Sequence, residues 1–382
     1  MAEPQPAGRA RIVVLGMSTT EICGVRDHAE LLAGELDRQG LSCSLHWLER
    51  SDQSLRGSRA QVRAWVSEFT HVLAEQRPDF VILHYSVFAF SYRGLPLFVP
   101  GLSGALRRTG VPVLTIVHEA AYPFSIGGPR GKLWAASQRL VLIGVTRASA
   151  GLLVTADFRA RWLESRRWLA RRPIAMAPVF SNLPAPGEGT RAGTPGDLIG
   201  LFGYSYEGAA VALVLDALLE LGRQGTAARL LLLGAPGPSS AAAGAWVTAA
   251  VARGLAGSLT FTGTLPAQEL VDAMAGCDLL IVANDGGPTS RKGTLAGSLG
   301  SGSPVLAIDG PRRWRELIDG ETIRIADRTP KALADAAREL LADRAQRDAL
   351  GARGRSFAAD RMGVGRTAEA IAELARRLGL SV

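Results

Sequence analysis

Short apolar runs alternate with amphipathic segments along most of the chain. Runs such as residues 11–16 (RIVVLG) and 79–85 (DFVILHY) are separated by segments such as 24–40, where apolar residues recur at helical spacing between glycines. Short continuous apolar runs are typical of strands covered on both faces, and the amphipathic segments predict the covering helices. The alternation therefore predicts an α/β protein built from doubly wound, Rossmann-like parallel sheets.

The alternation breaks once and then restarts. The stretch FSNLPAPGEGTRAGTPGD before residue 198 is rich in proline, glycine and polar residues, which is typical of a linker. We predict an N-terminal domain over 1–180, a linker over 181–197, a C-terminal domain over 198–360, and a last helix over 361–382 that packs back on the N-terminal domain. Because ligands bind beyond the carboxyl ends of parallel strands, two such domains predict a cleft for two substrates.

Composition narrows the class of protein. A length of 382 residues, with 47% hydrophobic and 20% charged residues, fits a two-domain globular protein. The three cysteines show neither disulfide nor metal-ligand spacing, which favours a reducing compartment. The N-terminus lacks the apolar region of a signal peptide, and no run reaches the roughly 20 apolar residues of a membrane span. We therefore expect a cytoplasmic protein.

The chain carries a formal charge of +8, and arginine supplies most of the cations because only three lysines are present. This excess has two interpretations: a GC-rich coding sequence, or an anionic partner such as a phosphate ligand, a lipid headgroup or a nucleic acid. The arginines are mostly scattered, which favours the first. Without a basic stripe or a recognised module, we predict no nucleic-acid partner.

The segment 284–294 (NDGGPTSRKGT) follows the apolar run DLLIVA and opens a helix rich in small residues. A helix start offers free N–H groups and the positive end of a dipole, and hydroxyls and cations there add anion-binding groups. The segment predicts a phosphate or diphosphate site. The alternative is an ordinary capped helix with solvated cations. The candidate residues are Gly286, Gly287, Thr289, Ser290, Arg291, Lys292, Gly293 and Thr294.

Several motifs, in this order, resemble a known family. They are CGVRDHAELLAGEL, VPVLTIVHEA, PVFSNLP, LTFTGTLPAQELVDAMAGCDLLIVA and SGSPVLA. Together they resemble the GT-B fold glycosyltransferases, specifically the retaining group called family four, over nearly the whole chain. The resemblance implies two Rossmann-like domains facing across a cleft. It also implies transfer of a sugar, with retention, from a nucleotide-diphosphate sugar to a glycan, a lipid-linked acceptor or a small molecule.

The resemblance also assigns residues. It places His118 on the donor sugar near the reaction centre, with Glu119 orienting it or meeting the acceptor. It places the donor against Gly203, Tyr204 and Ser205, and the nucleotide base against Gly234, Thr264 and Leu265.

Acceptor contacts follow from the residues themselves. Gly24 opens a helix, so it allows either close approach of a ligand or simply a tight turn. Arg26 meets an anionic acceptor or lies on a solvated face. In the aromatic stretch 83–96, Tyr85 and Tyr92 stack on the acceptor or pack in the core.

The chain departs from that family at four positions. The two positions that normally carry glutamates hold Thr289 and Gly297, and the two that normally carry diphosphate-binding cations hold Tyr204 and Glu207. We hypothesise that Arg291 and Lys292 replace the missing cations. The alternative is a catalytically altered relative that binds a nucleotide sugar or another phosphate ligand without standard transfer.

The expected chemistry uses no metal and no cofactor, because the chain has no Asp-x-Asp pair to hold a divalent ion. The resemblance implies a same-side displacement in which the departing phosphate acts as base. The segment 158–172 (FRARWLESRRWLARR) has two interpretations. It is either a solvated basic helix or a peripheral contact with the inner face of an anionic membrane.

Overall fold

The computed structural model describes residues 9–20, 23–187, 197–203, 208–234 and 240–382. The chain forms two compact units, Met1–Pro178 with Val364–Val382, and Val179–Gly363. The chain passes to the second unit at Val179. Residues 179–187 already pack on that unit, since the Val179 amide donates to the Ser290 carbonyl at 2.8 Å. Part of the predicted linker, 188–196, lies outside the described residues.

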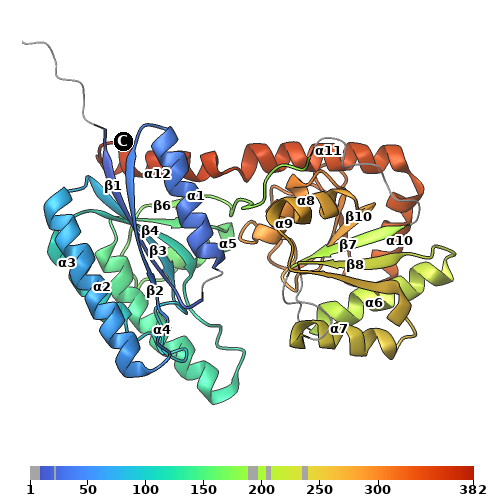
Figure 1. Ribbon diagram of the computed structural model, residues 1–382, viewed down its shortest axis with the longest axis horizontal. Coiled ribbons are helices and arrows are strands. Elements are labelled where there is room, and N and C mark those ends of the chain that lie inside the picture. The colour runs from blue at the N-terminus through green and yellow to red at the C-terminus, as the bar shows by residue number, and fades with distance from the viewer. Residues whose placement is uncertain (1–8, 21–22, 188–196, 204–207, 235–239) are drawn as a thin grey trace, which may run out of the picture. The chain divides into compact units, whose positions relative to one another are not determined.

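The N-terminal unit is built on six parallel strands in the order β2-β1-β3-β4-β5-β6 (Figure 1). The strands are β1 (Arg11–Ser18), β2 (Ser42–Glu49), β3 (Phe80–Ser86), β4 (Val113–Glu119), β5 (Gly151–Val154) and β6 (Ile174–Met176). The helices are α1 (Gly24–Arg38), α2 (Leu55–Gln76), α3 (Val99–Thr109), α4 (Gly128–Ala148), α5 (Asp157–Glu164) and α12 (Val364–Arg377). The order of connection reverses between β1 and β3, which makes this pair the topological switch point.

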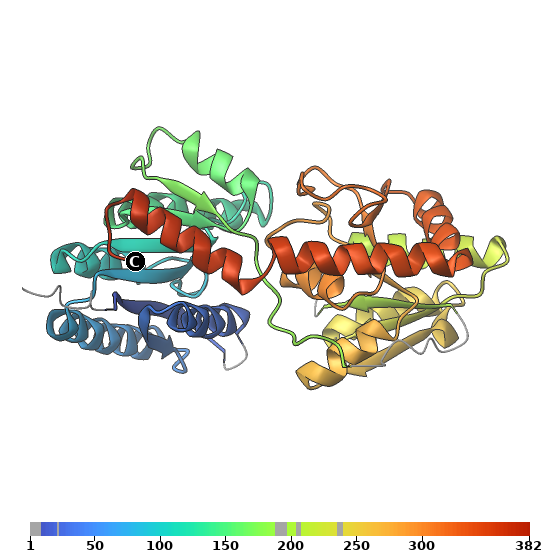
Figure 2. The same cartoon turned by 90° about the horizontal axis from the view of Figure 1, so that it is seen from above.

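Helices cover both faces of this sheet (Figure 2). Neighbouring helices α2, α3 and α4 bury one apolar face, and α1 and α12 lie together on the other. The ends of α2 follow from local sequence. Ser54 caps the first turn by accepting a bond from the Gly57 amide at 3.0 Å, and Arg77 ends the helix in a left-handed conformation before Pro78.

The C-terminal unit has six parallel strands in the order β12-β11-β10-β7-β8-β9. The strands are β7 (Leu198–Phe202), β8 (Arg229–Leu233), β9 (Leu259–Gly263), β10 (Leu279–Val282), β11 (Val305–Ile308) and β12 (Arg324–Ala326). The helices are α6 (Gly208–Arg223), α7 (Ala241–Val251), η1 (Ala256–Ser258), α8 (Ala267–Ala275), α9 (Gly293–Gly300), α10 (Pro330–Ala342) and α11 (Arg344–Arg361). Here the switch point lies between β7 and β10.

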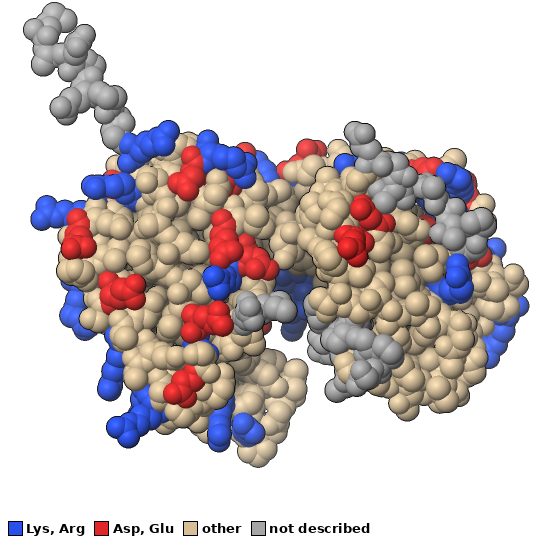
Figure 3. Space-filling model, viewed as in Figure 1, with Lys and Arg blue, Asp and Glu red and all other residues tan. Residues whose placement is uncertain are grey.

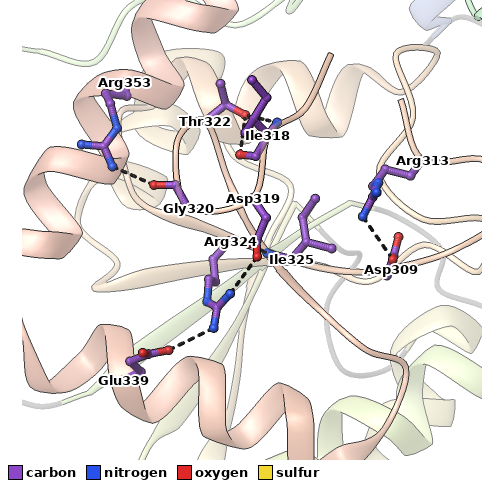
Figure 4. A network of polar contacts seen from close by, with 10 residues as sticks. All are labelled: Asp309, Arg313, Ile318, Asp319, Gly320, Thr322, Arg324, Ile325, Glu339 and Arg353. Atoms are coloured by element: carbon purple, nitrogen blue, oxygen red, sulfur yellow. Dashed lines mark hydrogen bonds and ion pairs between the residues drawn. The ribbon is translucent and has the colours of Figure 1, made fainter. Parts of the chain in front are cut away.

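A polar network fixes the segment that follows β11 (Figure 4). The Asp319 carboxylate accepts bonds from the Arg324 guanidinium at 2.9 Å and from the Ile325 amide at 2.7 Å. Arg324 also pairs with Glu339 of α10 at 3.1 Å, and Arg353 of α11 donates to the Gly320 carbonyl at 3.0 Å. These bonds therefore join the segment to β12, α10 and α11. The loop after β10 lies beside the segment.

Among the described residues, no helix combines the length and apolarity that crossing a bilayer requires. The two doubly wound sheets match the predicted fold class. Basic and acidic side chains are interspersed over the face of the N-terminal unit shown in Figure 3, in keeping with the scatter of arginines along the chain.

Candidate functional site

The loop between β10 and α9 follows the switch point of the C-terminal unit, where an open parallel sheet presents its ligand site. Its glycines allow a close contact between backbones. A Cβ added at Gly310 would lie 2.4 Å from the carbonyl carbon of Gly286 and from the amide nitrogen of Gly287. Gly287 has a φ of 85°, which favours glycine. These glycines therefore pack the loop on the supported segment after β11.

Two hydroxyl residues of this loop are buried. Thr289 is 4% exposed and Ser290 is 1% exposed. The hydroxyl of Thr289 is buried without a hydrogen-bond partner in the parts of the chain that the structure describes. A buried hydroxyl without a partner costs free energy.

The start of α9 carries two cationic residues. Arg291 and Lys292 are half-buried and immediately precede the helix, and Gly293 and Thr294 form its start. Lys292 holds the N-cap position, and its side chain makes no capping hydrogen bond in the described structure. Ser54, Ser240, Thr329 and Asp343 do cap α2, α7, α10 and α11. The helices α1, α3, α4, α5 and α8 also begin without a side-chain cap, so α9 shares this feature with them.

The other predicted donor residues follow adjacent strands of the same sheet. Gly203 ends β7 with its amide donating to the Leu233 carbonyl at 3.1 Å. The amide of Gly234, after β8, donates to the Thr262 hydroxyl at 3.1 Å. The exposed Thr264 and half-buried Leu265 follow β9. Tyr204, Ser205 and Glu207 lie outside the described residues.

Gly297, one of the two positions where the resembled family carries glutamate, lies in a closed environment. A Cβ there would lie 3.2 Å from atoms of Leu183 and Phe202, which is tighter than usual van der Waals contact. A Cβ there would require both neighbours to shift by a few tenths of an ångström. The departure from the family pattern is therefore built into the packing around α9.

Three histidines gather near the switch point of the N-terminal unit. His28 comes from α1, His84 from β3 and His118 from β4. The ring centroids are 5.5 Å apart for His28 and His84, 5.1 Å for His28 and His118, and 5.2 Å for His84 and His118. His84 Nδ1 and His118 Nε2 share a hydrogen bond of 3.1 Å. Sequence reasoning identified only His118.

Burial keeps these imidazoles neutral. It lowers the pKa of His28 to about 4. It also lowers the pKa of His84 and of His118 well below the usual value, and the charge that His28 would carry lowers both further. At neutral pH His118 is therefore a hydrogen-bonding group rather than a cation.

A β-bulge sets the position of His118. Tyr85 pairs with Val117 but Ser86 pairs with Glu119, so His118 is the extra residue on β4. The Arg159 guanidinium of α5 donates to the His118 carbonyl. Glu119 accepts a bond from the Ser86 hydroxyl at 2.8 Å, so its hydrogen bond goes to Ser86 rather than to the imidazole.

The first turn of α1 lies close to this cluster in sequence. Gly24 is exposed and a Cβ there would meet nothing within 4 Å, so the turn does not require glycine for space. Arg26 pairs with Glu30 at 2.9 Å and with Glu49 at 3.4 Å. Its charge is thus balanced within the protein, which favours the structural interpretation over an anionic acceptor.

The aromatic stretch after β3 requires a correction. Tyr85 is 0% exposed and stacks on Phe90 at 5.7 Å within the apolar core. The predicted acceptor contact at Tyr85 is wrong, because residue 85 alternates onto the face covered by α2, α3 and α4. Tyr92 is half-buried, with the Arg93 guanidinium 5.4 Å from its ring centroid.

Three of these residues escaped sequence reasoning: His28, His84 and Arg159. The sequence held one signal, because LHYS and VHEA end successive apolar runs with a histidine near the same strand end. Adjacent parallel strands bring such positions together. His28 and Arg159 gave no comparable signal, because α1 and α5 reach the cluster through tertiary packing alone.

Comparisons with known proteins show which family and which folds the chain resembles. Residues 197–343 match the family model "Glycosyl transferases group 1". A search of curated proteins gives no match.

Solved structures resemble nearly the whole chain. Alr3699/HepE from Anabaena, in complex with UDP and glucose, has a TM-score of 0.69 at 13% identity over 97% of this chain and 100% of that chain. Sucrose-phosphate synthase from Thermosynechococcus elongatus has a TM-score of 0.70 at 15% identity over 97% and 99%. WaaG, a glycosyltransferase involved in lipopolysaccharide biosynthesis, has a TM-score of 0.64 at 15% identity over 95% and 99%. The chain therefore has the GT-B fold of these structures, and its residues 197–343 match the family of glycosyl transferases group 1.

Proposed function

We propose that the protein transfers a sugar from a nucleotide-diphosphate sugar to an acceptor, with retention and without a metal. The loop 284–292 carries the proposal. It joins a buried hydroxyl without a partner, two half-buried cations and an uncapped first helical turn at the switch point of the C-terminal sheet. Such groups stabilise a leaving diphosphate, which is the main electrostatic demand of the reaction.

We propose that His118 forms a hydrogen bond with the donor sugar. It lies at the carboxyl end of β4 on a bulge, and burial lowers its pKa so that the ring is neutral. A neutral imidazole donates or accepts a hydrogen bond at a sugar hydroxyl without opposing the positive charge that develops at the anomeric carbon. No side chain is assigned as nucleophile, so the departing phosphate serves as base in a same-side displacement.

Nucleotide release from a panel of UDP-, GDP- and ADP-sugars tests the proposal. UDP-sugars come first because the HepE structure of the same fold contains UDP and glucose. Changing Arg291 and Lys292 together to Gln should lower the rate about 100- to 1,000-fold, since each cation is lost from the transition state. The matched controls are Arg344→Gln and Lys331→Gln, whose side chains are each 75% exposed in the same domain. Equal losses in variant and control would contradict the assignment.

Two further measurements test the proposed retention of configuration and the proposed metal independence. The anomeric configuration of the product, read by NMR, should match that of the donor. A rate unchanged by EDTA supports metal independence, and a rate abolished by EDTA and restored by Mg²⁺ contradicts it.

A second candidate function is nucleotide-sugar binding without standard transfer. The packing around Gly297 favours it, because a Cβ would already lie 3.2 Å from Leu183 and Phe202 at this position, where the resembled family carries an acidic side chain. A thermal-shift screen separates the two. Stabilisation by a nucleotide sugar without any nucleotide release identifies a binding protein, whereas stabilisation with release identifies the transferase.

We also propose that the transferase works in the cytoplasm, on a membrane-associated acceptor, through a surface that we call the α4 surface: Phe124, Ile126, Leu133, Leu140 and Trp168. Leu133 and Leu140 lie seven residues apart on one face of α4 and are 58% and 68% exposed. Ile126, just before the helix, is 55% exposed.

Arginines intersperse this surface. The Arg139 guanidinium lies 4.2 Å from the Phe124 ring centroid, and Arg166 lies 5.2 Å from that of Trp162. Exposed apolar side chains beside cations are suited to the interface of an anionic bilayer. This extends the interpretation of residues 158–172 to α4, where the exposed apolar side chains are more numerous.

Flotation with vesicles checks the α4 surface. The protein should float with phosphatidylglycerol vesicles and not with phosphatidylcholine vesicles, and Leu133→Ser with Leu140→Ser should abolish flotation. Val251→Ser, a 60% exposed position in the other domain, is the control. No flotation with either lipid would favour a water-soluble acceptor.

A further inference from the structure

The three histidines of the N-terminal unit exceed what the proposed transfer requires. That proposal uses His118 alone and leaves His28 and His84 without a role. His28 is 5% exposed and His84 is 1% exposed, so neither is a surface residue. Imidazole side chains drawn from three separate elements into one cluster need a reason beyond packing.

Their geometry is that of a set of ligands. One ligand atom from each ring lies within 4.8 Å of the other two. Zinc bonds to imidazole nitrogen at about 2.1 Å in a tetrahedral arrangement, which places ligand nitrogens roughly 3.4 Å apart. The His84 and His118 nitrogens that share the hydrogen bond are already 3.1 Å apart. Rotation of the rings closes the remaining gap.

The hydrogen bonding of the cluster is incomplete. His84 makes its bond through Nδ1, and its Nε2 is buried without a partner within the described parts of the chain. In either tautomer of the pair, one buried nitrogen of His84 is thus left unsatisfied. The hydrogen bonds within the cluster therefore do not by themselves satisfy its imidazoles.

The residues around the cluster favour a metal ion of intermediate softness. Among the residues that the structure describes, no carboxylate or thiol joins the three imidazoles in the cluster. The Trp47 ring lies beside the cluster, with its centroid 6.2 Å from that of the His84 ring. Sets of neutral imidazoles suit zinc, copper, nickel and cobalt, whereas magnesium and calcium need oxygen ligands.

We propose that His28, His84 and His118 form a binding site for one divalent transition-metal ion of the zinc class. The ion takes the place of the hydrogen bond between His84 Nδ1 and His118 Nε2, the proton of that bond moves to the other nitrogen of the donating ring, and His28 supplies the third bond. A metal on His118 occupies the group that we propose for the sugar. The site therefore opposes the transferase when it is loaded, a consequence that rests on the proposed function.

Cobalt titration of EDTA-treated, full-length protein tests the site directly. We expect one Co²⁺ per chain, with the visible absorption bands of a four- or five-coordinate ion, displaced by Zn²⁺. Elemental analysis after dialysis against Zn²⁺ should give the same ratio of one. Absence of these bands together with no retained zinc would overturn the proposal.

Single variants identify the ligands. Losing an outer-shell partner usually weakens metal affinity about 10- to 100-fold, so losing a ligand by His28→Gln or His84→Gln should weaken it by about 100-fold or more. His71→Gln is the matched control, because His71 lies on α2 with its side chain 73% exposed. Equal affinity in His28→Gln, His84→Gln and the wild-type protein would assign the metal elsewhere and overturn the proposal.

Metal-induced stabilisation provides a readout that does not need activity. Zn²⁺ should raise the Tm of the wild-type protein and of His71→Gln, and leave that of His28→Gln unchanged. Melting each variant without metal first confirms that it folds. Protein that binds zinc but releases no nucleotide from any donor would contradict the transferase and leave the metal site standing, whereas inhibition by Zn²⁺ in the wild type but not in His28→Gln supports both.

Discussion

The two switch points follow the same topological rule, but backbone contacts form the C-terminal one and packed side chains form the N-terminal one. In the C-terminal unit, loops after β10 and β11 meet backbone to backbone, because Gly286, Gly287 and Gly310 leave no side chains between them. In the N-terminal unit, side chains fill the corresponding space, with Trp47 lying where β1 has Gly16, beside the histidine cluster. Backbone groups and helix termini suit a charged diphosphate, and side chains suit a sugar, an acceptor or a metal.

The difference has a mechanical consequence. A shift in a packed side chain is absorbed by rotation, whereas a shift in backbone moves the whole loop. Glycine substitutions at the C-terminal switch point should therefore cost more unfolding free energy than those at the N-terminal switch point. Four substitutions test this contrast, from the largest expected effect to the smallest.

Gly310→Ala should have the largest effect. The added Cβ would lie 2.4 Å from backbone atoms of Gly286 and Gly287, so the loop after β10 must move. We expect a loss of about 3 kcal/mol in the free energy of unfolding of the C-terminal unit, together with weaker nucleotide-sugar binding. Urea unfolding monitored by tryptophan fluorescence measures the first. Gly222→Ala in α6 has open space around its Cβ and should be neutral or stabilising by up to about 1 kcal/mol.

Gly16→Ala should have a smaller effect in the N-terminal unit. Its Cβ would lie 2.0 Å from the Trp47 ring, and the ring must turn away. We expect a loss of about 1–2 kcal/mol and a changed tryptophan emission spectrum, because a side chain moves rather than the backbone. Gly34→Ala in α1, where a Cβ meets nothing within 4 Å, is its control. A larger loss at Gly16 than at Gly310 would reverse the comparison.

Thr289→Val should separate binding from stability. Its hydroxyl is buried without a partner in the described structure, so removing it should leave the unfolding free energy unchanged or slightly higher. If the hydroxyl serves the diphosphate, affinity for the nucleotide sugar should fall about tenfold. Calorimetric titration with the best donor from the screen measures this. Unchanged affinity would remove Thr289 from the donor site.

Tyr85→Phe should have the smallest effect. The Tyr85 hydroxyl is also buried without a partner among the described residues, but the ring is 0% exposed in the core. Its removal should change the unfolding free energy by less than about 1 kcal/mol and leave donor and acceptor affinities unchanged. A fall in acceptor affinity would restore the original prediction for this residue. Together with Thr289→Val, this substitution tests whether removing an unsatisfied hydroxyl lowers ligand affinity only at a position that a ligand contacts.

The sequence by itself determined the sheets and the C-terminal loop. Period and run length are local properties, so β10, α9 and the groups between them could be placed from residues 279–300 alone. The linker prediction rests on proline and glycine content, which is likewise a local property.

Only the tertiary structure decided which side chains meet. His28 lies 56 residues before His84 and 90 before His118, and no spacing rule joins a helix to two strands across that distance. The same limit explains Tyr85, whose face depends on which helices cover it, and Gly297, whose closure depends on Leu183. Local sequence fixes the conformation of a segment, but a site made from several segments is fixed by the packing that folding brings about.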